Sequence, residues 1–450
     1  MTQPAEASLT QTETGQLVLR GGRPLHGRIR LLGAKNSLPK IMVAALLTDE
    51  PCVLREVSNI SDVLIVSDLI RALGGTVRTL EDGAISICAR DVHPMERAVL
   101  REFSGKSRIP ILTCGPLLAR FGATPVPSLG GCRIGARPVD FHINALQQLG
   151  ATLHEETGAA HLTVEGRLQG NRFRLDYPSV GATEQVILAS VRAEGVTELS
   201  NAAVEPEIMD LIMVLQKMGA VISVDIDRTI TIIGVRNLRG YDHTPVPDRL
   251  EAASWACAAI ATGGRIFVEN ARQADMMTFL NRFRQVGGDF RVDSNGIEFW
   301  REREALRSIV VETDVYPGFS TDYQQPMVIA LSQAQGVSIV HETVYEQRFG
   351  YVEALNRMGA QIQLYRECLG GLKCRFGQRN YKHSAVIVGP TPLHGANIHI
   401  PDLRAGFSYI IAALAAEGVS TITNTQLIQR GYENLIPKLQ SLGADILDTE

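Results

Sequence analysis

The chain has 450 residues, which is too long for one compact hydrophobic core, so two or three domains are expected. Apolar residues make up 45% of the sequence and charged residues 20%, as in an ordinary water-soluble globular protein. The formal net charge of -4 argues against a nucleic-acid partner, because no run of Lys and Arg compensates for it.

Two further features of composition bear on where the protein works. No segment approaches the ~20 consecutive apolar residues of a membrane span, and the first fifteen residues lack the apolar stretch of a signal peptide. The seven cysteines are odd in number and lie mostly inside apolar patterns. They therefore predict reduced thiols in the cytoplasm rather than a disulfide framework.

An internal repeat organises the chain. A helix-ending signature, apolar-x-x-apolar-Gly-(Gly/Ala) followed by a strand-like run, occurs at residues 70–75, 146–151, 215–220, 283–288, 355–360 and 439–444. In each copy the first glycine stands where a helix C-terminus needs a left-handed residue. The period of roughly seventy residues exceeds that of common solenoids and predicts six αβ modules. They divide most naturally as three and three, with a change of domain at 245–249.

Taken in chain order, the first segment that joins glycine to a charge is Gly33–Asn36. It opens an apolar helix over 41–47, so Lys35 is expected near a helix N-terminus, where anions bind readily. The second is the run Gly130–Asp140, which places Cys132 between glycines and two arginines. Neighbouring positive charge favours the thiolate, so this cysteine is predicted to be reactive, whereas Cys114 and Cys257 lie in apolar helical patterns and are expected in the core.

Two later segments have the same character. Asp322 stands near the start of an apolar helix, after Pro317-Gly318, and Arg404 precedes the apolar run 409–416. Each segment alone is weak, because a charge at a helix start is more often a cap or a solvated side chain. Glu205 and Glu207 are interpreted as acids that pack the domains together rather than as site residues.

Residues from about 366 to 392 form a polar insertion that lengthens the last repeat interval. Cys368, Cys374 and His383 in this insertion could in principle bind zinc. The five-residue gap between the cysteines is unlike the common two- to four-residue spacing. The sequence therefore predicts no metal site.

In their order and spacing, ten segments make the chain resemble the enolpyruvyl transferases from about residue 17 to residue 447. The segments are Gly33–Asn36, Gly115–Gly122, Gly131–Asp140, Pro178–Thr183, Glu205–Glu207, Pro247–Arg249, Phe319–Asp322, Glu342–Phe349, Asp402–Arg404 and Arg430–Glu433. The resemblance implies an α/β fold, a two-domain inside-out α/β barrel (α/β prism) of six repeated βαβαββ units. It implies one domain over 35–246, a second over 1–34 plus 247–450, and an active site in the cleft between them.

The resemblance is strongest to family members that add the 3-hydroxyl of UDP-N-acetylglucosamine to C2 of phosphoenolpyruvate and then release phosphate, the first committed step of peptidoglycan synthesis. It implies that Cys132 is the proton donor, and the target of fosfomycin, and that Asp322 is the base. The phosphoenolpyruvate-binding residues it implies are Lys35, Asn36, Arg137 and Arg404. The nucleotide-sugar residues it implies are Arg108, Arg137, Pro138, Val139, Asp140, Phe141, Tyr177, Pro178, Ser179, Val180, Asp322 and Val344. No cofactor, metal, nucleic acid, membrane or obligate protein partner is implied.

Some positions depart from the family pattern. Leu112 and Gln429 replace an aromatic residue and an aspartate that are usual there, and Tyr177 stands where some members have lysine. These departures leave open a paralogue that acts on another nucleotide acceptor such as UMP. A non-catalytic UDP-sugar-binding protein on the same fold is a second alternative, disfavoured because both Cys132 and Asp322 are present. A shikimate 3-phosphate enzyme is disfavoured, because those enzymes lack a cysteine loop of this kind.

Overall fold

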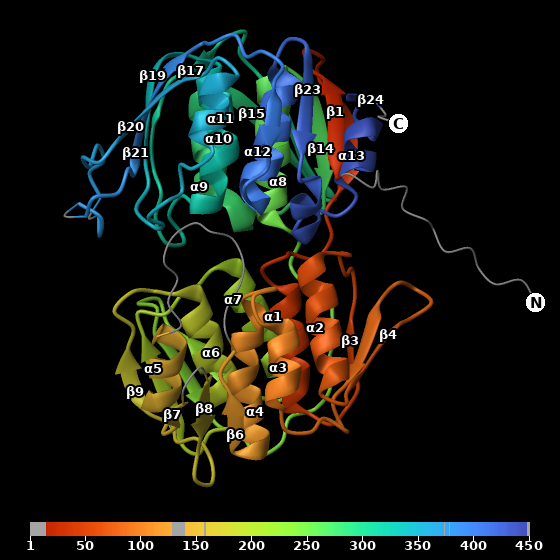
Figure 1. Cartoon of the computed structure of the whole chain (residues 1–450), viewed down its shortest axis with the longest axis vertical. Helices are drawn as coiled ribbons and strands as arrows, with labels where there is room; N and C mark the ends of the chain where they lie inside the picture. The colour runs from red at the N-terminus through yellow and green to blue at the C-terminus, as the bar shows by residue number, and fades with distance from the viewer. Residues whose placement is uncertain (1–14, 128–139, 157–158, 373, 378, 448–450) are drawn as a thin grey trace, which may run out of the picture.

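A computed structural model describes residues 15–127, 140–156, 159–372, 374–377 and 379–447. The chain forms two lobes, one above the other in Figure 1. One hydrophobic core is built from residues between 38 and 241, and the other from residues 17–31 together with residues between 250 and 442. We call the lobe around the former the first lobe and the other the second lobe.

Three mixed or antiparallel sheets surround the core of the first lobe. In spatial order they are β13 (Asp242–His243), β3 (Cys52–Leu54), β5 (Ile85–Cys88) and β4 (Thr76–Thr79); β6 (Ala123–Pro125), β8 (Ala159–Thr163) and β7 (Thr152–Glu156); and β11 (Val221–Val224), β12 (Ile230–Ile233), β10 (Val196–Ser200) and β9 (Arg172–Arg174).

The second lobe has three sheets of its own. They are β15 (Gly288–Asp293), β16 (Gly296–Arg301), β14 (Arg265–Glu269) and β2 (His26–Arg30); β17 (Leu306–Arg307), β19 (Ala334–His341), β21 (Ser384–Gly389) and β20 (Gln361–Tyr365), with β18 (Val310–Glu312) paired to β19; and β22 (Asn397–His399), β23 (Val419–Thr423), β1 (Gln16–Arg20) and β24 (Asp445–Leu447). Within the described residues each sheet is open, and none closes into a barrel.

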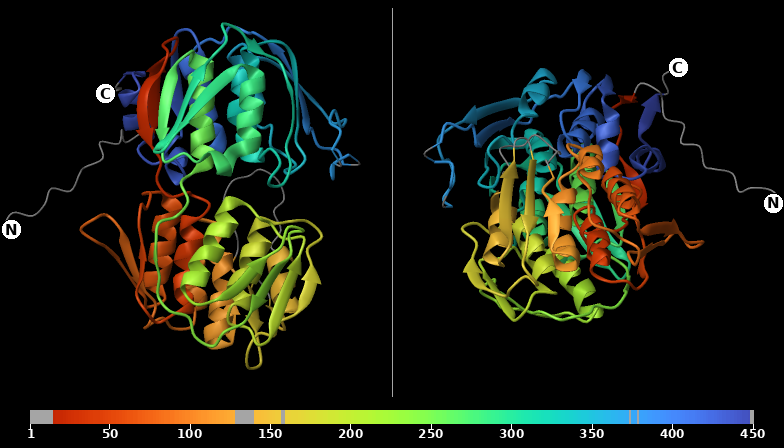
Figure 2. Two further views of the ribbon diagram at one scale, coloured as in Figure 1. Left: turned by 180° about the vertical axis from the view of Figure 1, so that it is seen from behind. Right: turned by 60° about the horizontal axis from the view of Figure 1, so that its bottom comes forward.

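Helices fill the inside of each lobe and sheets lie outside them (Figure 2). The first lobe contains α1 (Leu38–Ala44), η1 (Ala45–Leu47), α2 (Ser61–Ala72), α3 (Arg97–Phe103), η2 (Ile109–Thr113), α4 (Cys114–Phe121), α5 (Asp140–Gln148), α6 (Val180–Ser190) and α7 (Pro206–Lys217). The second contains α8 (Arg249–Thr262), η3 (Gln273–Met276), α9 (Met277–Val286), α10 (Thr321–Ser332), α11 (Val352–Arg357), α12 (Leu403–Ala415), η4 (Thr425–Arg430) and α13 (Leu435–Ser441).

The second lobe is centred on α8, α10 and α12, which contact one another and are buried along nearly their whole length. Each begins at a polar cap: Asp248, Ser320 and Asp402 accept hydrogen bonds from backbone amides of the first turn. These caps fix where each helix starts, and therefore where Asp322 and Arg404 lie.

The predicted helix ends are confirmed. The first glycine of all six signature copies has a positive φ, between 87° and 111°, at Gly74, Gly150, Gly219, Gly287, Gly359 and Gly443. A Cβ is strained in that region, so glycine at these positions ends the helix and lets the chain turn into the following strand. The strands that follow are β4, β7, β11, β15, β20 and β24.

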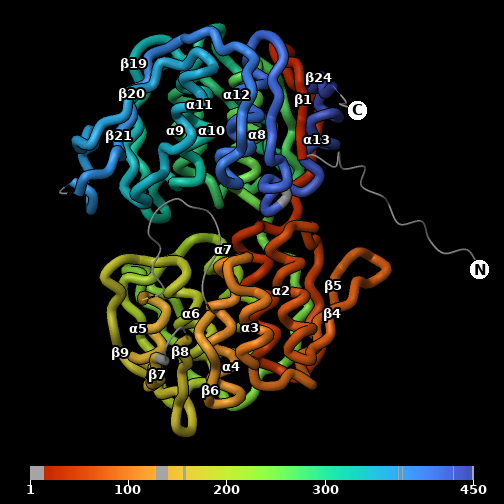
Figure 3. The backbone as a smooth tube through the Cα atoms, in the orientation of Figure 1, coloured from red at the N-terminus to blue at the C-terminus, as the bar shows by residue number. Residues whose placement is uncertain are grey.

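Two segments connect the lobes and lie side by side, the red and green crossings in Figure 3. Gly33 forms an antiparallel bridge with Pro247, and the Ala34 amide donates to the Val246 carbonyl at 2.8 Å. Farther in, Arg249 of α8 reaches Glu207 of α7 through two hydrogen bonds of 3.0 and 3.2 Å. The interpretation of Glu207 as an acid that packs the two halves together is thus confirmed.

The insertion is shorter than expected. Residues 384–389 form β21, which pairs antiparallel with both β19 and β20, so this part of the expected insertion belongs to the sheet. The apolar stretch Ala385–Val388 sits next to polar residues and was therefore assigned to the insertion. Within the described part of the chain, no helix has the length and apolar character needed to cross a bilayer.

Candidate functional site

Asp322 lies in the first turn of α10, between two arginines of the second lobe. Its carboxylate accepts a hydrogen bond from Arg348 Nη2, and its other oxygen lies 3.5 Å from Arg404 Nε. Burial alone would raise the pKa of Asp322, but the charges of Arg348 and Arg404, with Lys35 behind them, hold it below its usual range. The carboxylate is therefore ionised, as a proton acceptor must be.

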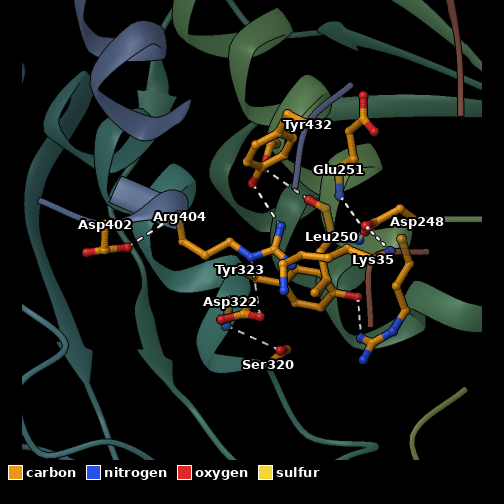
Figure 4. Close-up of polar contacts among 12 residues, drawn as sticks. Lys35, Asp248, Leu250, Glu251, Ser320, Asp322, Tyr323, Asp402, Arg404 and Tyr432 are labelled. Atoms are coloured by element: carbon orange, nitrogen blue, oxygen red, sulfur yellow. Dashed lines mark hydrogen bonds and ion pairs between the residues drawn. The ribbon is translucent and has the colours of Figure 1, made fainter. Parts of the chain in front are cut away.

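Arg404 is held at the N-terminal end of α12. Its backbone amide donates to the Asp402 cap at 3.0 Å, and its Nη1 donates to the Tyr432 hydroxyl at 3.0 Å (Figure 4). The side chain is only 7% exposed. A guanidinium in this position presents a fixed positive charge that can fork onto phosphate or carboxylate.

Lys35 comes from the segment that connects the lobes. Its backbone amide donates to Asp248 at 3.1 Å, and its Nζ lies 2.8 Å from Asp62 of α2. Burial would raise the pKa of Asp62, but Lys35 and a 2.8 Å hydrogen bond from Ser107 outweigh it and hold that pKa below the usual value. Arg430 of η4 approaches the same carboxylate at 3.9 Å, so the second lobe contributes a further cation.

The structure thus brings Lys35, Asp322 and Arg404 together from parts of the chain about three hundred residues apart (Figure 4). Two arginines share the single carboxylate of Asp322, and the buried Nε of Arg348 has no hydrogen-bond partner in the part of the chain that the structure describes. An unpaired buried donor is costly, which favours an anionic ligand that would accept from it. The arrangement suits a small molecule that carries several negative charges.

A second group of predicted residues meets where the two lobes face each other. Arg375 lies over the Tyr177 ring of the first lobe, 4.4 Å from its centroid, and its guanidinium donates to the Val344 carbonyl of the second lobe. Burial raises the pKa of Tyr177, and its hydroxyl has no hydrogen-bond partner among the described residues. Pro178 follows it, and Ser179 caps α6, whose first residue is Val180.

The remaining predicted residues occupy nearby parts of the first lobe. Arg108 immediately precedes η2 and follows Ser107, which anchors it beside the Lys35–Asp62 pair. The Asn36 carbonyl accepts from Lys40, which forms a 3.2 Å ion pair with Glu184. Asp140 is exposed at the start of α5, and Phe141 packs against the core of the lobe.

Four predicted site residues, Cys132, Arg137, Pro138 and Val139, lie outside the described residues. Among the described cysteines, Cys114 and Cys257 are buried as expected, and burial raises the pKa of the Cys114 thiol to about 12.

Sequence reasoning did not include four residues in the site: Asp62, Arg348, Arg375 and Tyr432. Arg348 and Tyr432 stand within segments that carry the family resemblance, and that position was an available signal. Asp62 and Arg375 stand in no such segment, and only their tertiary contacts with Lys35 and Tyr177 reveal them.

The comparisons with known proteins agree with this geometry. A family model described as EPSP synthase (3-phosphoshikimate 1-carboxyvinyltransferase) matches residues 19–439. The chain belongs to this family of enolpyruvyl transferases.

Similar curated proteins cover almost the whole chain. A protein of Protochlamydia amoebophila named UDP-N-acetylglucosamine 1-carboxyvinyltransferase is 50% identical over 96% of this chain and 93% of its own length. A protein of the same name from Chlamydia abortus is 49% identical over 95% of this chain and 96% of its own.

Solved structures share the fold at much lower identity. The enolpyruvyl transferase NikO of Streptomyces tendae superposes with a TM-score of 0.84 at 22% identity, over 96% of this chain and 99% of its own. EPSP synthase of Acinetobacter baumannii superposes with a TM-score of 0.76 at 17% identity, over 97% of this chain and 100% of its own. The mixed α/β fold is that of enolpyruvyl transferases.

Proposed function

We propose that this enzyme transfers the enolpyruvyl group of phosphoenolpyruvate to the 3-hydroxyl of UDP-N-acetylglucosamine, with release of phosphate, as the first committed step of peptidoglycan synthesis. The observation that carries the proposal is the convergence of Lys35, Arg404 and an ionised Asp322 from distant segments. The names of the relatives at 49–50% identity give the same acceptor.

In the addition step, Asp322 takes the proton of the sugar 3-hydroxyl while the oxygen of that hydroxyl bonds to C2 of phosphoenolpyruvate. At the same time Cys132 gives a proton to C3, so that a tetrahedral phospho-ketal forms. The low pKa of Asp322 makes it a weak base in the free enzyme. When the phosphate and carboxylate of phosphoenolpyruvate lie against Lys35, Arg137 and Arg404, they offset the positive charges around Asp322 and raise its pKa toward what proton removal requires.

In the elimination step, the C2–O bond to phosphate breaks while a proton returns from C3 to the Cys132 thiolate, which gives the enol ether. The proton taken by Asp322 goes to the leaving phosphate, so both residues regain their starting states. The leaving phosphate carries the negative charge that develops, and fixed cations stabilise it without reorganising. Lys35, Asn36, Arg137 and Arg404 are assigned to phosphoenolpyruvate on this basis.

The nucleotide sugar is assigned to the surface where the lobes face each other. Tyr177 with the N-terminus of α6 and Val344 approach from opposite lobes, and Arg375 contacts both Tyr177 and Val344. Arg108, the segment 137–141 and residues 178–180 complete the assignment. Asp322 would then lie within reach of the sugar hydroxyl.

The two cores support a division into one domain over 35–246 and another over 1–34 plus 247–450, with the active site between them. The six sheets, three in each lobe, support six repeated units in a prism-like arrangement. The free cysteines suit a cytoplasmic enzyme.

A panel of acceptors tests the substrate. Phosphate release from phosphoenolpyruvate is expected with UDP-N-acetylglucosamine and not with UMP or shikimate 3-phosphate. Turnover with UMP would favour the paralogue, and saturable binding of the UDP sugar without phosphate release would favour a binding protein.

Fosfomycin labelling tests the role of Cys132. This phosphonate epoxide should be guided by Lys35, Arg137 and Arg404 and should alkylate Cys132, as intact and digested mass spectrometry would show. Cys132→Ser should lose both labelling and most turnover, whereas Cys132→Asp should resist labelling and keep some activity, because a carboxylic acid can still donate a proton. An adduct on Cys114 or Cys257, or full activity of Cys132→Ser, would refute the assignment.

A further inference from the structure

Four side chains with the donor atoms that zinc prefers meet at the edge of the second lobe. They are His341 at the end of β19, Cys368 and Cys374 in the segment 366–383, and His383 directly before β21. Their ligand atoms all lie within 4.8 Å of one another, and Cys368 Sγ is 3.4 Å from His383 Nε2. The ligand atoms of a tetrahedral zinc are separated by about 3.3–3.8 Å, so closing the set around an ion needs small side-chain shifts.

Both imidazoles keep a lone pair on Nε2 for a metal: His341 Nε2 makes no hydrogen bond to a described residue, and His383 Nε2 lies against the Cys368 thiol. The Ser384 hydroxyl donates to the Glu367 carbonyl at 2.7 Å, so it accepts from His341 Nδ1 at 2.8 Å. His383 Nδ1 faces the Tyr381 carbonyl at 2.8 Å and must carry its proton. In both rings the lone pair is therefore on Nε2, and hydrogen bonds of this kind orient metal-bound histidines.

His341 provides an independent sign of a missing partner. The residue is fully buried, and its Nε2 makes no hydrogen bond to any described residue. A buried acceptor without a partner is unfavourable. A bound cation at the centre of the cluster would satisfy it.

The backbone is shaped around the sulfur atoms. The Phe376 amide donates to Cys374 Sγ at 3.3 Å and holds the sulfur in place. A Cβ at Gly377 would lie 3.1 Å from Cys368 Sγ, and one at Gly370 would lie 2.5 Å from the His341 ring. Glycine at these two positions therefore lets the backbone pass close to Cys368 and to His341.

We propose that His341, Cys368, Cys374 and His383 form a tetrahedral Zn²⁺ site that fastens the segment 366–383 to the sheet. Two thiolates and two imidazoles are a donor set typical of structural zinc. The sequence prediction of no metal site rested on a spacing rule for ligands in one short hairpin. Here His341 and Ser384 are paired across β19 and β21, so two ligands come from neighbouring strands and the spacing rule does not apply.

The site has a consequence for the nucleotide-sugar surface, and this step rests on the proposed function. Arg375 follows Cys374 directly, and it joins Tyr177 of the first lobe to Val344 and Glu346 of the second. A metal that fixes Cys374 would fix Arg375 in this position. Arg375 would then act as a positioning residue for Tyr177 and Val344.

Metal content tests the site without any activity assay. Native mass spectrometry of the full chain, loaded with Zn²⁺ and desalted, should show one zinc per chain, and Co²⁺ should give the thiolate charge-transfer and tetrahedral d–d bands. Both signals should be lost in Cys368→Ser/Cys374→Ser and retained in Cys88→Ser, which changes a partly exposed cysteine of the first lobe. Absence of metal in the unmodified chain, metal retained by the double variant, or a Cys368–Cys374 disulfide under reducing conditions would each overturn the proposal.

Kinetics test the positioning role separately. Removal of the metal should raise KM for UDP-N-acetylglucosamine about tenfold, leave KM for phosphoenolpyruvate within twofold, and be mimicked by Arg375→Ala in the metal-loaded protein. An unchanged KM for the nucleotide sugar in the metal-free protein would refute the positioning role. If the protein released no phosphate with any acceptor, the proposed function would fail while the metal measurements would still decide the site.

Discussion

Arg249 on one side, and Arg348 with Arg404 on the other, are buried arginines that differ in how many of their hydrogen-bond donors have partners. All three nitrogens of Arg249 have partners, two of them on Glu207 and the third on the Tyr323 hydroxyl at 2.8 Å. Arg348 and Arg404 share the single carboxylate of Asp322, and no described residue accepts a hydrogen bond from Arg348 Nε. A cation whose donors are all bonded within the protein holds the structure together, whereas cations in excess over their acid are suited to bind an anion.

Replacement of Asp322, the acid that Arg348 and Arg404 share, should have the largest effect on the enzyme. Asp322→Asn should lower kcat by about 10²- to 10⁴-fold, because general-base assistance is lost while Arg348 and Arg404 stay in place. KM for phosphoenolpyruvate should not rise, since two positive charges are released toward the ligand. Steady-state phosphate release is the measurement.

The matched control is Asp289→Asn, an acid in the same lobe that pairs with Arg284 at the surface, 2.7 Å apart. This variant should have a kcat and a KM for phosphoenolpyruvate within twofold of those of the unmodified enzyme. A kcat of Asp322→Asn within threefold of the unmodified enzyme would contradict the assignment of the base.

The Arg249–Glu207 pair should behave as a structural contact. Arg249→Met leaves the buried Glu207 carboxylate without its partner and should lower the free energy of unfolding by about 3–5 kcal/mol. Arg249→Met/Glu207→Leu should cost clearly less than the sum of the single variants, because no uncompensated charge remains. Urea unfolding of the unmodified protein, the two single variants and the double variant gives a double-mutant cycle. If the changes in free energy of unfolding simply add, the two side chains are not coupled.

The sequence was sufficient where structure is decided locally. The six helix ends at glycine, such as Gly219 and Gly359, depend on a backbone conformation that few other residues adopt. The start of α10 at Thr321 and of α12 at Leu403 follows from caps directly beside Asp322 and Arg404. Asp322 was therefore placed correctly at the start of its helix, whereas Arg404, expected ahead of the apolar run 409–416, is the second residue of α12.

Side-chain contacts between residues far apart in the chain could not be predicted from the sequence. Asp62 meets Lys35 within the first lobe and Arg430 only where the second lobe approaches it, and its own neighbours in sequence carry no signal. For the proposed zinc site, the gap between Cys368 and Cys374 argued against a metal, and His341 lies 27 residues before Cys368, on another strand. Strand pairing, which places His341 beside Ser384, is what joins them.

The smallest expected effect concerns Glu205, which stands two residues before Glu207 but has no arginine bonded to it. Its Oε2 has no hydrogen-bond partner, and burial, opposed only in part by Arg249 and Arg228, raises its pKa to about 7 from 4.5. The folded state therefore holds the proton more tightly than the unfolded state between these two pH values, and stability should fall as pH rises through that window. Above pH 7 the full cost of a buried, unpaired carboxylate is present.

Glu205→Gln removes this titration, because an amide stays neutral. The variant should match the unmodified protein near pH 4.5 and become more stable by about 3 kcal/mol above pH 7. Unfolding in urea at pH 5 and pH 8 measures the change, with Glu165→Gln, an exposed acid of the same lobe, as a control that should show no pH-dependent gain. A stability difference that does not vary with pH would mean that Glu205 is ionised in both states, and that Arg249 serves two carboxylates rather than one.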